Sequence, residues 1–217
     1  MNYFKNKKIL ITGHTGFKGS WLTLYLLVKG AKIMGISNNI PTKPSLFKIL
    51  KLQKKIKHVK ADIRNLKKIK RYFLKFNPDF VFHLAAQSLV KKSYNKPLDT
   101  WSTNLFGTLN VLECLKFQKK NSISVLITSD KSYKNLETKK GYKENDALGG
   151  VDPYGASKSA ADIAISSYIK SYFSSGVKKK IAIARAGNVI GGGDWSEDRL
   201  LADCFKHWLK NKKVNIR

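Results

Sequence analysis

The stretch KILITGHTGFKGSWLTLYLLVKG, residues 8–30, decides the fold of this chain. A short apolar run leads into Gly13, Gly16 and Gly19, and apolar residues then recur with a helical period as far as Leu27. This order predicts a strand, a glycine loop and a helix. The first glycine allows a sharp turn, the second lets backbone N–H groups approach a pyrophosphate, and the third lets the helix pack close to the strand.

A diphosphate bound at this loop would meet the positive end of the helix dipole. The alternative is a glycine-rich turn in an unrelated α/β protein. The position of the loop, directly after the first apolar strand and directly before an amphipathic helix, favours a dinucleotide site. The spacing GxxGxxG, with one more residue than the usual GxGxxG, is typical of the short-chain dehydrogenase/reductase superfamily.

The composition predicts one core and no membrane span. A chain of 217 residues that is 42% hydrophobic can bury one substantial core, which suits a single Rossmann-type domain. No apolar run approaches the 18 or so residues of a span, and the first residues lead directly into a core strand, so we expect a soluble, cytoplasmic protein. Cys114 and Cys204 lack the spacing of a metal or redox pair, which predicts reduced core cysteines and no metal site.

The formal charge of +28 raises the alternative of a nucleic-acid binder. The excess is nearly all lysine, spread over every predicted element, whereas phosphate recognition usually enlists arginine for bidentate contacts. A coding bias toward Lys, Asn and Ile explains the pattern more simply. We therefore expect no nucleic-acid partner, and a basic field that at most attracts an anionic substrate.

The rest of the chain alternates between strand and helix patterns. Further strands are predicted at 32–37, within 56–65, and at 79–88, 123–128 and 181–192, with helices at 66–76, 100–117 and 154–174. Six strands with intervening helices predict an α/β fold with a Rossmann-type, doubly wound parallel sheet.

Residues at the predicted strand ends suit a cofactor. Asn38 and Asn39 follow the second strand, where an NAD site usually offers an acidic residue to the ribose; their amides can still hydrogen-bond a ribose hydroxyl, and we expect NAD in preference to NADP. Asp62, after the third strand, is a suitable partner for adenine. His83 is expected to be a hydrogen-bonded core histidine, and Asn104, unfavourable inside a helix, to have a structural hydrogen-bonding role.

Tyr154 and Lys158 lie four residues apart in DPYGASKSAAD and share one helix face. A tyrosine with a pKa of about 10 needs a downward shift of roughly three units to act as a base near neutrality. A lysine ammonium one turn away, together with a nicotinium cation, is expected to favour the phenolate.

Polar residues are dense where the fifth predicted strand ends. Ser129 can hydrogen-bond Tyr154 and a substrate hydroxyl, Asp130 can act as an acid and Lys131 as a base. The alternative is that Asp130 and Lys131 form an ordinary surface turn pair.

Four stretches together resemble one family. They are GHTGFKGSWL (13–22), TSDKSYKN (128–135), LGGVDPYGASKSAAD (148–162) and ARAGNVIGGGDWSEDRL (184–200), and they are similar to the CDP-glucose 4,6-dehydratases, which are extended short-chain dehydrogenase/reductases. Related dTDP-sugar dehydratases have Thr-Asp-Glu where this chain has Ser129, Asp130 and Lys131, the CDP-type pattern. The resemblance implies a lyase of deoxysugar and O-antigen synthesis that acts as a homo-oligomer in its full-length form.

The resemblance also implies a set of site residues. NAD contacts are implied for Gly13, Thr15, Gly16, Phe17, Gly19, Asp62, Ile63, Leu84, Ala85, Ala86, Asn104, Tyr154 and Lys158, and substrate contacts for Ser88, Ser129, Asn188 and Arg199. The implied reaction converts CDP-glucose to CDP-4-keto-6-deoxyglucose by internal redox through NAD. In it Tyr154 takes the C4 hydroxyl proton, Lys131 removes the C5 proton, and Asp130 protonates the departing C6 hydroxyl.

The members of the resembled family are considerably longer. We therefore expect a dinucleotide-binding domain over 1–190 and, over 191–217, the start of a substrate-binding part that is largely missing, with weak sugar-nucleotide binding and little turnover. Two alternatives stay open. An NAD-dependent nucleotide-sugar epimerase or reductase would need Tyr154 and Lys158 but not Asp130 and Lys131, and a truncated fragment would bind NAD without catalysis.

Overall fold

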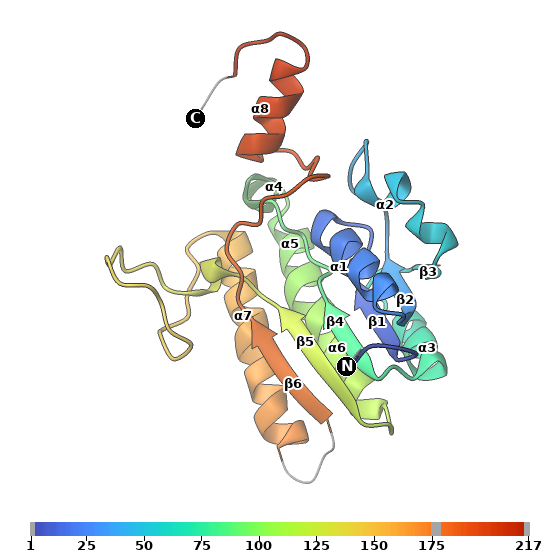
Figure 1. Cartoon of the computed structure of the whole chain (residues 1–217). Coiled ribbons are helices and arrows are strands. Elements are labelled where there is room, and N and C mark those ends of the chain that lie inside the picture. The colour runs from blue at the N-terminus through green and yellow to red at the C-terminus, as the bar shows by residue number, and fades with distance from the viewer. Residues whose placement is uncertain (1–2, 175–178, 215–217) are drawn as a thin grey trace.

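The computed structural model describes residues 3–174 and 179–214, and shows a six-stranded sheet in the order β3-β2-β1-β4-β5-β6 (Figure 1). All neighbouring strands pair in parallel. The strands are β1 (Lys8–Thr12), β2 (Lys32–Ser37), β3 (Lys57–Lys60), β4 (Phe80–His83), β5 (Ser122–Ile127) and β6 (Lys179–Ala184). The predicted Rossmann-type α/β fold is therefore confirmed.

Helices pack on both faces of the sheet. The longer ones are α1 (Phe17–Val28), α3 (Leu66–Phe76), α6 (Gly107–Phe117), α7 (Pro153–Tyr168) and α8 (Leu200–Trp208), and the short ones are α2 (Leu46–Ile49), α4 (Val90–Asn95) and α5 (Pro97–Trp101). One face packs against α3, α6 and α7, and the other packs against α1. The strands of β1 and β2 are apolar on both sides because both faces are covered there.

The connections place a ligand site at the carboxyl ends of the strands. β1 pairs with β2 on one side and with β4 on the other. The strand order therefore reverses at β1: β2 and β3 are added on one side of it, and β4, β5 and β6 on the other. In open parallel sheets this switch point leaves a crevice beyond the strand ends. The glycine loop, residues 13–16, lies there between β1 and α1 (Figure 1).

Three predicted elements differ from the observed ones. The strands predicted at 79–88 and 181–192 end at His83 and Ala184, and residues 84–88 and 186–189 beyond them line the crevice. The helix predicted at 100–117 is interrupted by a π-helical segment, η2 (Ser102–Phe106), and a second such segment, η4 (Ile169–Phe173), extends α7. Single π turns of this kind are frequent at functional sites.

The predicted buried side chains are observed. Cys114 and Cys204 are free and buried, and the ring of His83 is held between the hydroxyls of Thr12 and Thr108 at 2.6 and 3.0 Å.

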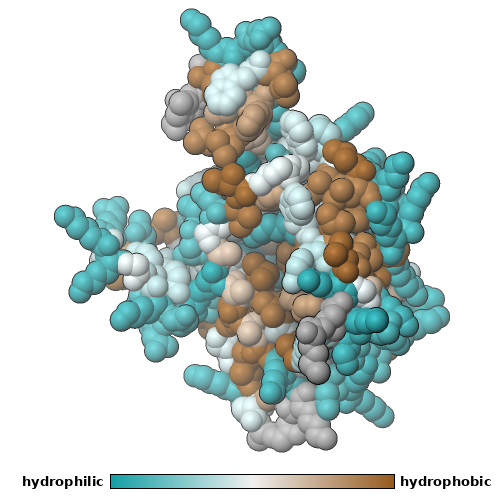
Figure 2. Space-filling model, viewed as in Figure 1, coloured by the Kyte–Doolittle hydropathy of each residue, from teal (hydrophilic) through white to brown (hydrophobic). Residues whose placement is uncertain are grey.

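Hydrophobic residues also gather on the surface around α8 (Figure 2), where Phe205 and Trp208 are exposed. Residues 215–217, the end of the predicted C-terminal part, lie outside the described residues.

Candidate active site

A cleft of about 760 Å³ opens at the carboxyl ends of the strands, a volume typical of small-molecule and cofactor sites. Nearly all the residues expected at a cofactor or substrate contribute to its wall. They are Gly13, Thr15, Gly16, Phe17, Gly19, Asp62, Ile63, Leu84, Ala85, Ala86, Ser88, Ser129, Asp130, Lys131, Tyr154, Lys158, Asn188 and Arg199. Asn104 is the exception.

The glycine loop is closed tightly by main-chain contacts. Gly13 has a φ of +75°, and a Cβ there would lie 2.6 Å from the backbone nitrogen of Ala85. A Cβ on Gly19 would lie 2.2 Å from the carbonyl oxygen of Gly13. Gly16 is the N-cap of α1 and has no side chain to bond the first-turn N–H groups, so these donors remain available for an anion in the cleft.

His14, which the sequence analysis did not identify, belongs to this loop and packs its side chain against β2 and β3. Its buried ring lies over Gly35, where a Cβ would be only 2.3 Å from the ring. Its nitrogens bond Ser37 Oγ at 3.1 Å and His58 Nδ1 at 2.7 Å. Burial, aided by the neighbouring His58, lowers the pKa of His14 to about 4, so the ring is neutral at pH 7. The glycine inside the strand KIMGIS was the available signal, since such a residue often marks close approach of another group.

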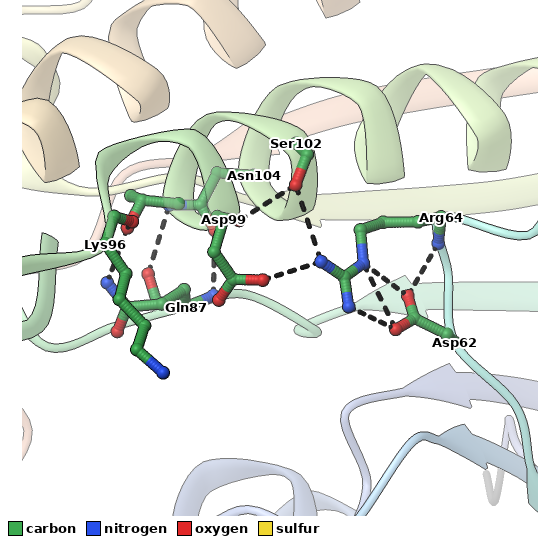
Figure 3. Close-up of polar contacts among 8 residues, drawn as sticks. Asp62, Arg64, Gln87, Lys96, Asp99, Ser102 and Asn104 are labelled. Carbon is green, nitrogen blue, oxygen red and sulfur yellow. Dashed lines mark hydrogen bonds and ion pairs between the residues drawn. The ribbon is translucent and has the colours of Figure 1, made fainter.

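Asp62 and Arg64 lie at the end of the cleft formed by the carboxyl ends of β2 and β3 (Figure 3). The guanidinium of Arg64 bonds Asp62 Oδ2 through Nη2 at 2.7 Å and Asp99 Oδ1 through Nη1 at 2.6 Å. Hydrogen bonds from Arg64 lower the pKa of Asp62, although partial burial opposes them. Lys43, in the loop after Asn39, also lines the cleft.

Tyr154 and Lys158 lie on the first turns of α7, which begins at the N-cap Asp152. The lysine is buried, and its Nζ donates to the carbonyl oxygen of Ile127 at 2.9 Å. Burial, with a smaller contribution from Lys18, lowers the pKa of Lys158 to about 8.

The predicted downward pKa shift of Tyr154 is not produced by the described chain. Burial raises the pKa of its phenol, and the charges of Asp130 and Asp152 add to that rise, while the neighbouring Ser129 and the charge of Arg199 oppose it. A further positive charge in the cleft is needed to reach the phenolate.

Asp130 and Lys131 project from a short 3₁₀ turn, η3 (Asp130–Ser132), directly after β5. Ser129 Oγ donates to Asp130 Oδ1 at 3.0 Å, and the backbone N–H of Lys131 donates to the same oxygen at 2.8 Å. These bonds orient the carboxylate at the cleft wall. Both side chains are exposed, and both residues line the cleft.

The substrate side of the cleft carries excess positive charge. Lys18, Lys158 and Arg199 influence one another, and the pKa of Lys18 is lowered first by burial and then by Arg199, with Asp130 opposing. The Nε of Arg199 is buried and has no hydrogen-bond partner among the residues that the structure describes. An anionic ligand would satisfy this donor and neutralise the charge.

Two buried networks hold the elements around the cleft in place. Asn104 bonds the backbone of Gln87 in both directions, at 2.8 and 3.0 Å, and donates to Ser157 Oγ at 2.9 Å, which shows the structural hydrogen-bonding role expected of it. Asp162 on α7 forms a bidentate ion pair with Arg185, with both distances 2.8 Å. β4, η2, α7 and the end of β6 are thereby fixed relative to one another.

Two negative findings concern residues 3–174 and 179–214 alone. In these ranges no cluster of three or more His, Cys, Asp or Glu side chains is arranged to hold a metal ion. Within the same ranges, no helix has the length and apolar character needed to cross a membrane.

The fold and the cleft define a Rossmann-type dinucleotide-binding protein with the Tyr-x-x-x-Lys helix of the short-chain dehydrogenase/reductases. The profile of the family described as GDP-mannose 4,6 dehydratase matches residues 10–181, and the chain belongs to this family. This confirms the family assignment made from the motifs.

Individual relatives agree with that assignment. The chain is similar to the CDP-glucose 4,6-dehydratase of Salmonella typhimurium, with 44% identity over 100% of this chain and 61% of the relative. It resembles the solved structure of Thermus thermophilus UDP-glucose 4-epimerase in complex with NAD, with a TM-score of 0.81 and 28% identity, over 95% of this chain and 64% of that one. The chain therefore spans somewhat less than two thirds of the length of the proteins it matches.

Proposed function

We propose that this chain carries the NAD-binding and catalytic part of a nucleotide-sugar 4,6-dehydratase that acts on CDP-glucose. The observation that carries the proposal is the turn holding Ser129, Asp130 and Lys131 on the same cleft wall as Tyr154 and Lys158. A redox step needs only the last two residues, whereas loss of water also needs an acid and a base. The 44% identity to a CDP-glucose 4,6-dehydratase supports the choice of substrate.

The residues present fit NAD. The uncapped N-terminus of α1 suits its diphosphate, and Asp62 and Ile63 at one end of the cleft suit its adenine. Ala85 and Ala86 leave room for a ligand against the end of β4, and Tyr154 and Lys158 would face the nicotinamide half. When bound, NAD supplies the hydride acceptor and the nicotinium charge. NAD remains our proposal over NADP, because Arg64 is already paired with Asp62 and Asp99.

The chain's own residues account for the proton transfers. Tyr154 takes the proton of the C4 hydroxyl, with Ser129 bonded to its phenol. Lys131 removes the C5 proton that the C4 ketone has acidified. Asp130 gives its proton to the departing C6 hydroxyl, so that water leaves. Asp130 and Lys131 share one short turn, which holds the acid and the base close together in the chain.

The second candidate function is nucleotide-sugar epimerisation. It is favoured by the structural similarity to the Thermus thermophilus UDP-glucose 4-epimerase. An epimerase has no use for the acid and base of the 3₁₀ turn, so the presence of Asp130 and Lys131 at the cleft favours the dehydratase. Detection of a 4-keto-6-deoxy sugar product would separate the two functions.

The decisive test is to alter the acid and the base in a chain extended to the length of its relatives. Lys131→Ala and Asp130→Asn should still allow transient NAD reduction with CDP-glucose while abolishing the 4-keto-6-deoxy product. Lys131→Ala should also slow deuterium exchange at C5. Lys139→Ala, at an exposed loop position, is the matched control for loss of a lysine. Dehydration at the unaltered rate in Lys131→Ala, or complete loss of NAD reduction, would refute the assignment of Lys131.

We extend the proposal to the domain organisation and the oligomeric state of the protein. Residues 1–190 would form the dinucleotide-binding domain and the segment from 191 onward would begin the substrate-binding part, consistent with the exposed apolar residues of α8. A cytoplasmic homo-oligomer that serves O-antigen deoxysugar synthesis remains part of the proposal. Sedimentation of the extended chain would test the oligomeric state.

A further inference from the structure

We infer that Arg64 is a positioning residue for the base of the bound dinucleotide, holding the Asp62 carboxylate so that it selects a base with an amino group over one with a carbonyl at the same position. This inference rests on the proposed NAD function. It concerns a residue that sequence reasoning did not assign, and it follows from the contacts drawn in Figure 3.

Arg64 holds Asp62 in a fixed plane. The carboxylate accepts the backbone N–H of Arg64 at 2.8 Å, its Nε at 3.0 and 3.1 Å, and its Nη2 at 2.7 Å. The guanidinium is planar and its donors form a rigid fork, so this bidentate pairing fixes both the position and the rotation of the carboxylate. Asn38 makes the smallest contribution to lowering the pKa of the same carboxylate, and it also lines the cleft.

Arg64 is itself held from the opposite side. Its Nη1 bonds Asp99 Oδ1 at 2.6 Å and reaches Ser102 Oγ at 3.5 Å. Asp99 lies in the first turn of α5, and Ser102 begins the π-helical segment η2. Arg64 therefore spans the cleft wall from the end of β3 to α5, and Asp62, Arg64 and Asp99 all line the cleft.

These ion pairs are too exposed to be explained by stability. The side chains of Arg64, Asp62 and Asp99 are 39%, 30% and 36% exposed. Pairs at this exposure contribute little to folding, because water screens them and two side chains lose freedom. We infer instead that Arg64, which bridges the carboxylates of Asp62 and Asp99 beside the cleft, orients the Asp62 carboxylate.

The chemistry of the base makes that orientation selective. An ionised carboxylate only accepts hydrogen bonds, and Arg64 keeps Asp62 ionised by lowering its pKa. Adenine presents an amino donor at C6, whereas hypoxanthine presents a carbonyl acceptor there. A fixed carboxylate bonds the first and repels the second, while a rotating one can turn away from the mismatch.

The experiment compares binding of NAD and nicotinamide hypoxanthine dinucleotide to the 217-residue chain by calorimetric titration. The unaltered chain should bind NAD on the order of tenfold more tightly, as expected for one hydrogen bond to a charged group. Arg64→Ala should reduce this ratio to within about twofold, and Arg64→Lys should restore it only in part because an ammonium lacks the planar fork. Arg71→Ala, at an exposed arginine of α3, should keep the full ratio.

The outcomes separate the inference from the proposed function. If the unaltered chain binds neither dinucleotide, the proposed function is refuted and the inference falls with it. If it binds both equally, or if Arg64→Ala keeps the tenfold ratio, the inference alone is refuted. Asp99→Asn removes only the outer partner of Arg64 and should lower the ratio by a smaller factor, which provides a second measurement should Arg64→Ala fail to fold.

Discussion

The two halves of the cleft are built from different parts of the chain. On the side of β1 and α1 the wall is main chain, and the places of Gly13 and Gly19 leave no room for a Cβ. On the side of β5 and α7 the wall is made of side chains, including Ser129, Tyr154 and Lys158. The first half binds by backbone donors and shape, and the second acts through titratable groups.

This difference predicts two kinds of sensitivity. A substitution in the glycine half should damage folding and cofactor binding together, because backbone atoms cannot yield. A substitution on the cleft surface of the side-chain half should reduce the reaction rate and leave the fold largely intact. Denaturation and cofactor-binding measurements on variants of each half can test these two kinds of sensitivity.

Asp162→Asn is expected to be an exception to this difference. Asp162 lies on α7, in the side-chain half, but its role is to stabilise the fold. The carboxylate of Asp162 is fully buried and pairs with Arg185, whose side chain is 16% exposed. Its removal leaves a largely buried guanidinium without its counter-ion, and we expect a loss of about 3–5 kcal/mol in the free energy of unfolding. Chemical denaturation measures this, with the exposed Glu197→Gln as the control. A loss below about 1 kcal/mol would contradict the structural role.

Gly19→Ala tests the glycine half directly. The new Cβ would lie 2.2 Å from the carbonyl oxygen of Gly13 and 2.7 Å from the Cα of His14. Both atoms belong to the loop backbone, so we expect a loss of about 3 kcal/mol in the free energy of unfolding, together with loss of NAD binding. Gly141→Ala is the matched control, because a Cβ there meets no atom within 4 Å. Equal stability of the two variants would show that the loop can adjust.

Acid should destabilise the protein through two buried histidines, His14 and His83. Burial lowers the pKa of His14 to about 4 and that of His83 to about 3, from 6.5. The unfolded chain therefore binds more protons below pH 6.5, and the free energy of unfolding falls as the pH falls from 6.5 toward 4. The slope is about 1.4 kcal/mol per pH unit for each ring.

Denaturation at several pH values measures that slope. His14→Asn should reduce the slope, by removing one buried ring and the partner of His58, whose pKa burial also lowers; His207→Gln, at an exposed ring on α8, is the control. The carboxylates with lowered pKa values, Asp62 and Asp79, lose their contribution only as the pH falls below about 3.8, so they do not obscure this window. A flat profile between pH 6.5 and 4 would mean that the two rings are not buried as neutral groups.

Tyr154→Phe should have the smallest effect on stability and a large effect on rate. Only the phenolic hydroxyl is removed, and Ser129 keeps its bond to Asp130, so the free energy of unfolding should change by about 1 kcal/mol or less. In a chain of full family length, NAD reduction with CDP-glucose should fall by at least about a hundredfold. Equal losses of stability and rate would remove the distinction between the two halves.

Local sequence patterns were sufficient for much of this molecule. The glycine loop, the alternation of strands and helices, the Tyr154 and Lys158 pair, and the core position of His83 were all predictable, because each depends on residues within a few positions or on apolar periodicity. The ends of the strands were less predictable, since β4 stops at His83 although Leu84, Ala85 and Ala86 follow it. Strand ends depend on where the neighbouring strand stops, which local patterns do not record.

By itself the sequence determined the order of the elements, the place of the phosphate loop and the residue types available for catalysis, because spacing along the chain dictates these. The tertiary structure alone decided which distant groups meet. It brought His14 to His58 at 2.7 Å, Arg64 to Asp99 at 2.6 Å, and Asp162 to Arg185 at 2.8 Å. It also buried the phenol of Tyr154, which raises its pKa where the protein acts alone. The reason is physical: burial and long-range hydrogen bonds set charge and orientation, and both arise only once the sheet has assembled.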